Sequence, residues 1–213
     1  MAKSELISRQ SRQPSGWLGE IVARGMAFET ARENRVAVER LAVRADESVL
    51  EVGCGHGRTL AGIAQTASGF VAGVDPSEVM VRLARRRLRR WIAVGQAEVT
   101  LGTGSSLPYP DARFDAALAV HVLAFWTDAV AELREIRRVL RPGGRVLLGY
   151  RPRDATTLAA LPATVYTLRS VDETQRLLAE AGFGAVHSTE FALPNKRFVC
   201  TEAVSPASPE MSA

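Results

Sequence analysis

The stretch SVLEVGCGHG, Ser48–Gly57, decides the fold of this chain. A short apolar run leads into three alternate glycines, Gly53, Gly55 and Gly57. The run predicts a buried strand, and the glycines predict a loop whose bare backbone can adopt positive φ angles. A helix beginning near Arg58 would present its free N–H groups to the same loop, where they favour a carboxylate or a phosphate. The sequence therefore predicts a ligand that lies against the main chain of this loop.

Outward from the loop, apolar runs alternate with segments of helical periodicity. This alternation predicts a doubly wound, mostly parallel sheet covered by helices. The expected parallel strands are Ser48–Val52, Phe70–Val74, Ala97–Leu101, Phe114–His121 and Arg145–Tyr150. Ala97–Leu101 is the most polar of them, so we expect it nearer an edge. The expected helices run through Val79–Ile92, Ala129–Leu140 and Val171–Ala181.

Two further β-like stretches, Ala185–Phe191 and Arg197–Val204, are separated by Pro194 and Asn195. Turn residues between two such runs predict an antiparallel hairpin. The expected fold class is thus α/β, with a seven-stranded sheet that ends in a C-terminal antiparallel hairpin.

The chain has 213 residues, which fits one domain. We expect residues 14–204 to form it, with 14–45 as a helical cap, and we expect residues 1–13 and 205–213 to be disordered. Two cysteines are too few for a disulfide framework, and no apolar run could span a membrane. These features predict a cytoplasmic protein without membrane insertion, present as a monomer or a homodimer.

Arginine occupies six of the nine positions from Arg82 to Arg90, in a chain whose formal net charge is +4. The cluster fits the polar face of the expected helix Val79–Ile92 and contains no interleaved aromatic residue. We therefore interpret it as a solvated face and expect no nucleic-acid partner. The alternatives are an acidic partner and a phosphate-bearing substrate.

Asp75 ends the second expected strand, 18 residues beyond Gly57. An acid at this place can accept hydrogen bonds from both hydroxyls of a ribose. Loop and acid together predict a nucleoside-bearing ligand. Dinucleotide sites use G-x-G-x-x-G, whereas the third glycine comes one residue earlier here.

The run from Glu51 to Gly57, E-x-G-x-G-x-G, resembles motif I of class I S-adenosylmethionine (SAM)-dependent methyltransferases. The similarity extends over roughly residues 45–150 and is greatest to the type 11, ubiquinone- and menaquinone-biosynthesis-like branch. The other segments that carry it are Gly73–Ser77, Leu107–Tyr109, Arg113–Asp115 and Leu133–Gly144.

The resemblance implies a Rossmann-like domain that uses SAM as its methyl donor and releases S-adenosylhomocysteine. It implies cofactor binding by Glu51, Gly53, Cys54, Gly55, Gly57, Asp75, Pro76, Met80, Thr103, Gly104, Ser105 and Val120. Thr103 is a departure, because members of the family usually carry an acid there that accepts a hydrogen bond from the adenine amino group.

The acceptor is expected to be a small molecule, methylated on an oxygen, nitrogen or carbon atom. Val122-Leu123-Ala124 replaces the motif of enzymes that methylate amino groups of bases or glutamine, and residues 151–170 are too few for a target-recognition domain. The expected pocket walls are Trp17, Met26, Phe28, Trp126, Tyr150, Arg151 and Tyr166. We expect no metal.

His121 is the candidate catalytic residue. It ends the fourth expected strand, beside the place where the methyl group should point. It is either a general base or a wall residue that shapes the pocket. Cys54, between two glycines, is interpreted as a small filler.

Two other functions stay open. One is a catalytically silent SAM-binding regulator or partner subunit. The other is an NAD(P)-dependent oxidoreductase, which the early third glycine and the lack of a Tyr-x-x-x-Lys pair disfavour.

Overall fold

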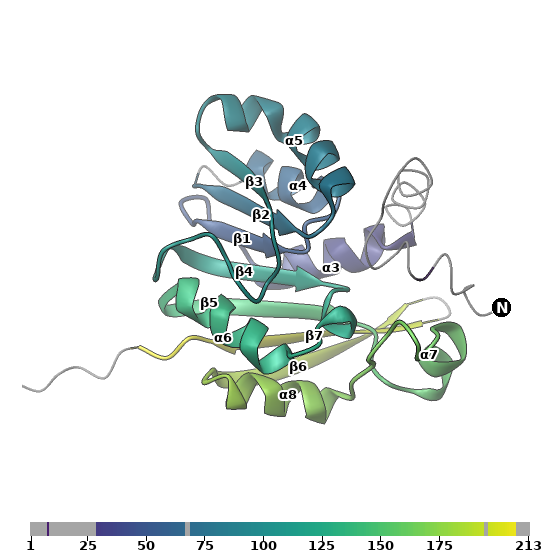
Figure 1. Ribbon diagram of the computed structural model, residues 1–213. Helices are drawn as coiled ribbons and strands as arrows, with labels where there is room; N and C mark the ends of the chain where they lie inside the picture. The colour runs from purple at the N-terminus through teal and green to yellow at the C-terminus, as the bar shows by residue number, and fades with distance from the viewer. Residues whose placement is uncertain (1–7, 9–28, 67–68, 194–195, 208–213) are drawn as a thin grey trace, which may run out of the picture.

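The computed structural model describes residues 8, 29–66, 69–193 and 196–207. One seven-stranded sheet, in the order β3-β2-β1-β4-β5-β7-β6, forms the centre of the molecule (Figure 1). The first five strands are parallel, and β7 runs antiparallel to both β5 and β6. The strands are β1 (Val49–Val52), β2 (Val71–Asp75), β3 (Ala97–Leu101), β4 (Phe114–Val120), β5 (Leu140–Tyr150), β6 (Gly184–Leu193) and β7 (Lys196–Val204).

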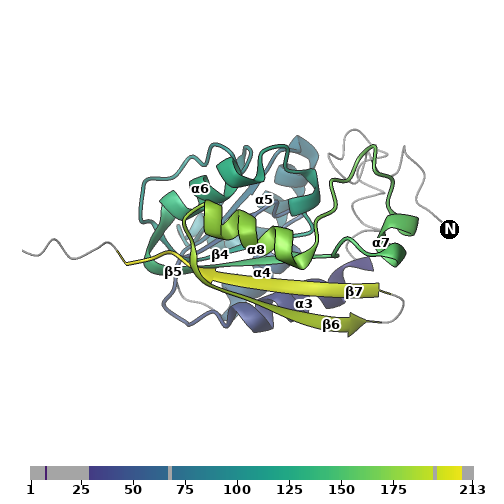
Figure 2. The ribbon, with the colours of Figure 1, turned by 90° about the horizontal axis from the view of Figure 1, so that it is seen from below.

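The seven-stranded sheet and its C-terminal antiparallel hairpin confirm the sequence prediction. The polar strand β3 lies at one edge of the sheet, and the β6–β7 hairpin, whose two strands Figure 2 shows side by side, lies at the other. The chain leaves β1 toward β2 and later returns on the other side of β1 as β4. This reversal creates a crevice beyond the carboxyl ends of β1 and β4, where ligands of such sheets bind.

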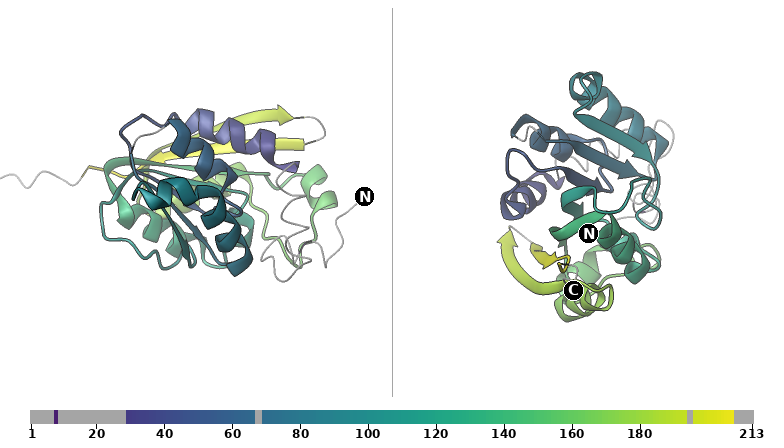
Figure 3. Two further views of the ribbon diagram at one scale, coloured as in Figure 1. Left: turned by 90° about the horizontal axis from the view of Figure 1, so that it is seen from above. Right: turned by 90° about the vertical axis from the view of Figure 1, so that its left-hand side faces the viewer.

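Helices cover both faces of the sheet (Figure 3). One apolar core joins α3, α4 and α5 to the sheet, and a second joins α6 and α8 to the opposite face. Alternate residues of β1 divide between them, since Val49 enters the first core and Leu50 the second. The helices are α3 (Ala31–Leu41), α4 (Arg58–Thr66), α5 (Glu78–Ala93), η1 (Leu123–Phe125, a 3₁₀ turn), α6 (Ala129–Val139), α7 (Ala155–Ala160) and α8 (Val171–Glu180).

Polar side chains fix the starts of three helices. Ser77 accepts a hydrogen bond from the N–H of Met80 in α5, and Asp128 accepts one from Ala131 in α6. Ser170 and Glu173 form a reciprocal capping box at α8. These caps explain why the predicted helix starts agree with the structure to within a residue or two.

Some predicted boundaries were wrong. We expected the disordered tail to begin at residue 205, but Ser205 is buried and exchanges backbone hydrogen bonds with Gly143 and Gly144. β5 begins at Leu140, which pairs with Phe114 of β4, and not at Arg145 as expected. Residues 151–170 contain the short helix α7, whose start Asp154 caps.

The predicted cap, residues 14–45, is described only from residue 29 onward. Its described helix α3 packs on β4, β5 and β7 and so belongs to a layer of the sheet. Residues 14–28, 208–213 and the predicted turn residues Pro194 and Asn195 lie outside the described residues.

Candidate active site

A cavity of about 350 Å³ lies in the crevice beyond the carboxyl ends of β1, β2 and β4; we call it the glycine-loop cavity. It brings together nine of the twelve residues predicted to bind the cofactor. Its lining residues are Val52, Gly53, Gly55, Val74, Asp75, Pro76, Met80, Gly102, Thr103, Gly104, Ser105, Val120, His121, Val122, Phe125, Trp126, Thr127 and Glu132.

Two glycines of the loop are required for different reasons. Gly53 has a φ of +72°, and a side chain there would overlap Val122 on the cavity wall. Gly57, with a φ of +73°, packs against Ala84 and Leu88 of α5, where a Cβ would come within 3.0 Å of both. Gly57 therefore lies behind the cavity wall and holds the loop against α5, in contrast to the predicted contact with the ligand.

Cys54 also lies behind the wall. Its sulfur packs so closely against Gly73 that a Cβ there would be 2.8 Å from Sγ. Burial raises the pKa of the Cys54 thiol well above its usual value, with the charges of Glu51 and Asp75 adding to the effect. The thiol stays protonated, which agrees with the filler role expected from the sequence.

Asp75 connects the ends of β1 and β2. Its Oδ2 accepts a hydrogen bond from the N–H of Gly55 at 2.9 Å, and its Oδ1 accepts one from Ser77 at 2.9 Å. Burial raises the pKa of this carboxyl, and the two backbone N–H groups lower it. Each carboxylate oxygen keeps further acceptor capacity for a hydroxyl in the cavity.

Glu51 is 4% exposed and does not line the cavity. Burial, followed by the negative charge of Asp75, raises its pKa to about 8; the N–H of Leu60 and the side chain of Thr59 act in the opposite direction. Glu51 is thus a neutral acid at pH 7, and its buried Oε2 has no hydrogen-bond partner among the described residues. Such an atom is costly unless a ligand or a water satisfies it.

Glu132 of α6 is a site residue that the sequence analysis missed. Thr103 Oγ1 and Ser105 Oγ hydrogen-bond to each other at 2.9 Å. Gly104 lies between these two residues in the sequence, and Oε2 of Glu132 packs against it. Burial, with a smaller contribution from the charge of Asp128, raises the pKa of Glu132 to about 7. A carboxyl group therefore stands beside the segment in which Thr103 replaces the usual acid. In the sequence, Glu132 looked like an ordinary acid in the first turn of a helix.

A second, smaller cavity of about 80 Å³ adjoins the first; we call it the side cavity. It brings together three predicted pocket walls, Tyr150, Arg151 and Tyr166, and it shares His121 and Phe125 with the glycine-loop cavity. Trp126 lines the glycine-loop cavity instead. The other lining residues of the side cavity are Glu29, Thr30, Ala124, Leu161 and Leu168. The expected walls Trp17, Met26 and Phe28 lie outside the described residues.

Arg169 stabilises the wall between the two cavities through hydrogen bonds to the backbone. Its guanidinium donates to the carbonyls of Leu123 and Trp126, at 2.6 and 3.1 Å. The N–H of Thr167 donates to the carbonyl of Ala124 at 2.8 Å. The segment after β4 is thereby tied to the loop before α8, so that the wall shared by the two cavities is fixed.

His121 stands at the junction of the two cavities. Its φ of +62° is unusual for a residue with a side chain, and its N–H donates to the carbonyl of Gly149 at 2.7 Å. Its ring packs on Phe198, and its Nε2 lies 3.3 Å from Oε2 of Glu33. Backbone strain of this kind often marks a functional residue.

Glu33 is fully buried on α3 and contacts two cationic side chains and His121. Arg151 Nε lies 3.2 Å from one of its oxygens, and Lys196 Nζ lies 3.1 Å from the other, which also faces His121. Burial would raise the pKa of Glu33, but His121, Arg151 and Lys196 together lower it to about 2. Glu33 is therefore an ionised carboxylate at all pH values at which the protein is expected to work.

The sequence analysis also missed Glu33, although the sequence contains a signal for it. Glu33, Ala37 and Leu41 are the buried residues of α3, spaced by four. An acid in the apolar stripe of a helix is rarely left buried without a partner. The partner could not be named, because Arg151 and Lys196 are more than a hundred positions away.

The methyltransferase domain family matches residues 50–148 of this chain. The chain is 32% identical over 182 residues to the O-methyltransferase resE of Aspergillus sclerotiorum, a match that covers 82% of this chain and 69% of that protein. It is 33% identical over 157 residues to the O-methyltransferase cnsE of Penicillium expansum, covering 71% of this chain and 57% of that protein. The chain belongs to the methyltransferase domain family, although it spans only about half the length of some relatives that it matches.

The fold is similar to that of the [4+2]-cyclase SpnF, with a TM-score of 0.71 and 20% sequence identity, covering 83% of this chain and 82% of that one. Since this structure is named as a cyclase, the fold alone does not define the chemistry, which depends on the site. Within the described ranges, no helix has the length and apolar character needed to cross a membrane.

Proposed function

We propose that this protein transfers a methyl group from SAM to a hydroxyl group of a small molecule and releases S-adenosylhomocysteine. The observation that carries the proposal is the position of His121, on the wall of both the glycine-loop cavity and the side cavity. The relatives named as O-methyltransferases support oxygen as the methylated atom.

The residues of the glycine-loop cavity fit the proposed cofactor. Asp75 offers carboxylate oxygens to the ribose, and Met80 and Pro76 offer apolar contact beside it. Glu132 lines the cavity, and its Oε2, which has no hydrogen-bond partner among the described residues, lies beside Gly104. We propose that Glu132 supplies the carboxyl that Thr103 lacks. Because Glu51 does not line the cavity, we propose that its buried Oε2 contacts the amino end of the ligand through a water.

When bound, SAM supplies a methyl group already activated on a sulfonium sulfur. The protein must then orient the acceptor hydroxyl and take up its proton. Positioning alone contributes ~7–11 kcal/mol to such reactions. Phe125 and Tyr166, whose rings lie 5.0 Å apart, together with Leu161, give the side cavity an apolar wall suited to an organic acceptor.

His121 is the proposed general base. Its Nε2 faces the ionised Glu33, so a neutral His121 ring would carry its proton on Nε2 and leave Nδ1 to accept the proton of the methyl acceptor. Glu33 would then act as a positioning residue that selects this tautomer and stabilises the imidazolium formed as the methyl group arrives. Arg151 and Lys196 keep Glu33 ionised and prevent it from taking the proton itself.

Calorimetric titration with S-adenosylhomocysteine and with NADPH tests the cofactor assignment. The expected result is binding of S-adenosylhomocysteine without binding of NADPH; binding of NADPH alone would assign an oxidoreductase. Transfer of labelled methyl from SAM to a panel of phenols and alcohols then tests the reaction. A protein that binds S-adenosylhomocysteine but methylates nothing, either in that panel or in a cell extract, would be a silent regulator and not an enzyme.

A further inference from the structure

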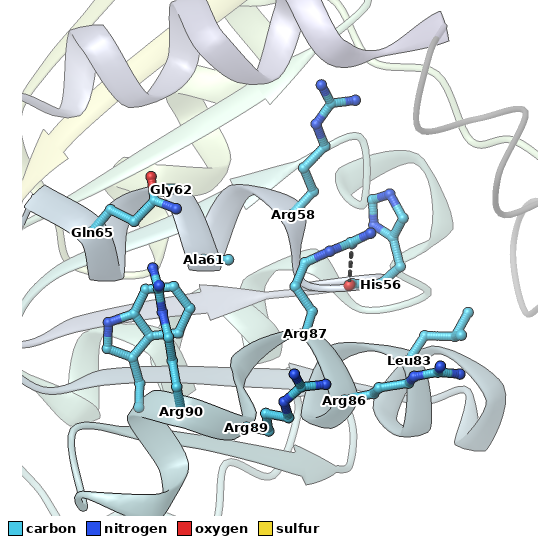
Figure 4. Close-up of a pocket in the computed structure, with 11 residues that line it drawn as sticks. His56, Arg58, Ala61, Gly62, Gln65, Leu83, Arg86, Arg87, Arg89 and Arg90 are labelled. Atoms are coloured by element: carbon cyan, nitrogen blue, oxygen red, sulfur yellow. Dashed lines mark hydrogen bonds between the residues drawn. The ribbon is translucent and has the colours of Figure 1, made fainter.

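A groove separate from the two cavities runs between α4 and α5 (Figure 4). Its volume is about 900 Å³, and none of its lining residues lines the glycine-loop cavity or the side cavity. In Figure 4, residues of α4 face residues of α5 across the hollow. We call it the arginine groove, after the five arginines that line it: Arg58, Arg86, Arg87, Arg89 and Arg90.

Four of the five arginines of the arginine groove, those on α5, have no acidic partner among the described residues. Among the described residues that line it, none is acidic. Arg86, Arg87, Arg89 and Arg90 form no ion pair with a described carboxylate, whereas Arg138, Arg145 and Arg151 elsewhere in the fold each do. Like charges three or four positions apart on one helix, such as Arg86 and Arg90, also repel each other. An anion bound in the groove would relieve this cost.

Two of the arginines are held in place. Arg87 Nη1 donates to the carbonyl of His56 at 2.6 Å, and the guanidinium of Arg90 lies over the ring of Trp91 at 3.8 Å. Burial, followed by the charges of Arg87 and Arg58, lowers the pKa of His56 to about 4. His56 is thus neutral at pH 7, and its buried Nε2 has no hydrogen-bond partner among the described residues.

We propose that the arginine groove is a second ligand site, which binds a small anion bearing a chain of phosphate groups. One guanidinium group can donate two parallel hydrogen bonds to a phosphate, so the four arginines of α5 suit several phosphates better than one carboxylate. The volume lies within the range of small-molecule sites. A nucleoside polyphosphate and an inorganic polyphosphate share this chemistry. The proposal does not depend on the proposed methyl transfer.

The arginine groove reaches the cofactor loop from its outer side. His56 lines the groove, while its neighbour Gly55 lines the glycine-loop cavity and donates its N–H to Asp75. An anion held by Arg58 and Arg87 would therefore lie next to the loop that binds the proposed cofactor. This adjacency gives the site a route by which it could regulate cofactor binding.

Calorimetry on the full chain at low salt, with sodium tripolyphosphate and ATP as probes, tests the proposal. Both probes are expected to bind, with affinity weakened at least ~10-fold in the double variant Arg86→Gln/Arg89→Gln. These arginines are exposed and make no contact with a described carboxylate, so the variant is expected to fold, which circular dichroism checks. The charge-matched control Arg35→Gln/Arg176→Gln, on α3 and α8, should bind both probes like the wild type. Tighter binding of ATP than of tripolyphosphate identifies a nucleoside polyphosphate, and equal binding identifies the phosphate chain alone.

Three results would overturn the proposal. The first is no binding of either probe at concentrations up to about 10 mM. The second is equal weakening in the control variant, which would mean that net charge alone attracts the probes. The third is a single-stranded DNA oligonucleotide that displaces ATP and binds at least ~100-fold more tightly than ATP, with strong salt dependence, because the groove would then be part of a nucleic-acid surface.

Discussion

Two buried carboxyl groups near the carboxyl edge of the sheet have opposite properties. Glu33 contacts His121 and Arg151, which line the side cavity. It is 0% exposed, and its pKa is lowered to about 2. Glu51, beside the glycine-loop cavity, is 4% exposed, and its pKa is raised to about 8. Burial acts on both in the same direction, so the neighbours account for the difference.

Glu33 contacts His121, Arg151 and Lys196, whereas the charged neighbour that acts on Glu51 is the acid Asp75. The region around Glu33 therefore holds a fixed negative charge, which suits stabilisation of an imidazolium. The region around Glu51 holds a neutral acid that can both donate and accept hydrogen bonds. One sheet edge thus provides two chemical environments, one for proton transfer and one for binding a cofactor.

The largest expected effect comes from removing the base. His121→Gln should lower turnover by ~10²–10⁴-fold with little change in affinity for S-adenosylhomocysteine, because Gln can hydrogen-bond to Glu33 but cannot accept a proton near neutral pH. Steady-state kinetics and calorimetry check this. The matched control is His187→Gln, at an exposed histidine of the hairpin. If His121→Gln keeps most of the activity with an unchanged pH profile, His121 is only a wall residue and alignment alone accounts for catalysis.

Removing the fixed charge tests the other half of the comparison. Glu33→Gln should destabilise the protein by about 3 kcal/mol at pH 7, the value of a pKa shift from 4.5 to about 2. Since the folded-state pKa is the lower one, this stability is present above pH 4.5 and is lost as the pH falls toward 2. Urea unfolding of wild type and variant should therefore give curves that converge between pH 7 and pH 3.

The exposed acid Glu39 on the same helix supplies the control, since Glu39→Gln should leave stability unchanged at both pH values. In kinetic assays, Glu33→Gln should lower kcat by at least ~10-fold, because the variant loses part of the ~10²–10⁴-fold contribution of the general base. KM for SAM should stay unchanged. A stability difference that stays the same from pH 7 to pH 3 would show that the Glu33 carboxylate is not held by its cations.

On the cofactor side, Asp75→Ala should weaken S-adenosylhomocysteine binding by ~1.5–3 kcal/mol, the value of hydrogen bonds to a charged acceptor. Calorimetry measures this, with Asp172→Ala in α8 as an exposed control. The same variant should lower the pKa of Glu51, since the charge of Asp75 helps to raise it. Unchanged affinity in Asp75→Ala would rule out the ribose assignment.

A further effect concerns Glu132, whose pKa is raised from 4.5 to about 7. Because the folded state holds the proton more tightly, its favourable contribution is present below pH 4.5 and is lost as the pH rises through 7. Glu132→Gln should therefore gain stability relative to wild type at pH 8 and not at pH 4. Thermal unfolding at the two pH values checks this, and a gain of equal size at both would point to packing instead of ionisation.

The cofactor side could be predicted from sequence because its residues follow consecutive strands within one motif region. Gly53, Asp75 and Val120 each come at or next to the end of a parallel strand, and such ends meet at one edge of a sheet. The same rule placed His121 at that edge.

The charged group around Glu33 could not be assembled in this way. Glu33, His121, Arg151 and Lys196 come from four separate elements or loops, and no local pattern encodes their contacts. Likewise, the hydrogen bonds between Ser205 and Gly143–Gly144 join segments about sixty positions apart, so the end of the domain was placed too early.

A crystal structure of the protein with S-adenosylhomocysteine tests the central claim most directly, because it shows where the sulfur atom lies. The account predicts that the ligand fills the glycine-loop cavity, with its ribose on Asp75, its adenine beside Glu132 and its sulfur facing His121 and the side cavity. A ligand whose adenine faces His121, or whose sulfur points away from the side cavity, would contradict the proposal that His121 takes the proton from the methyl acceptor.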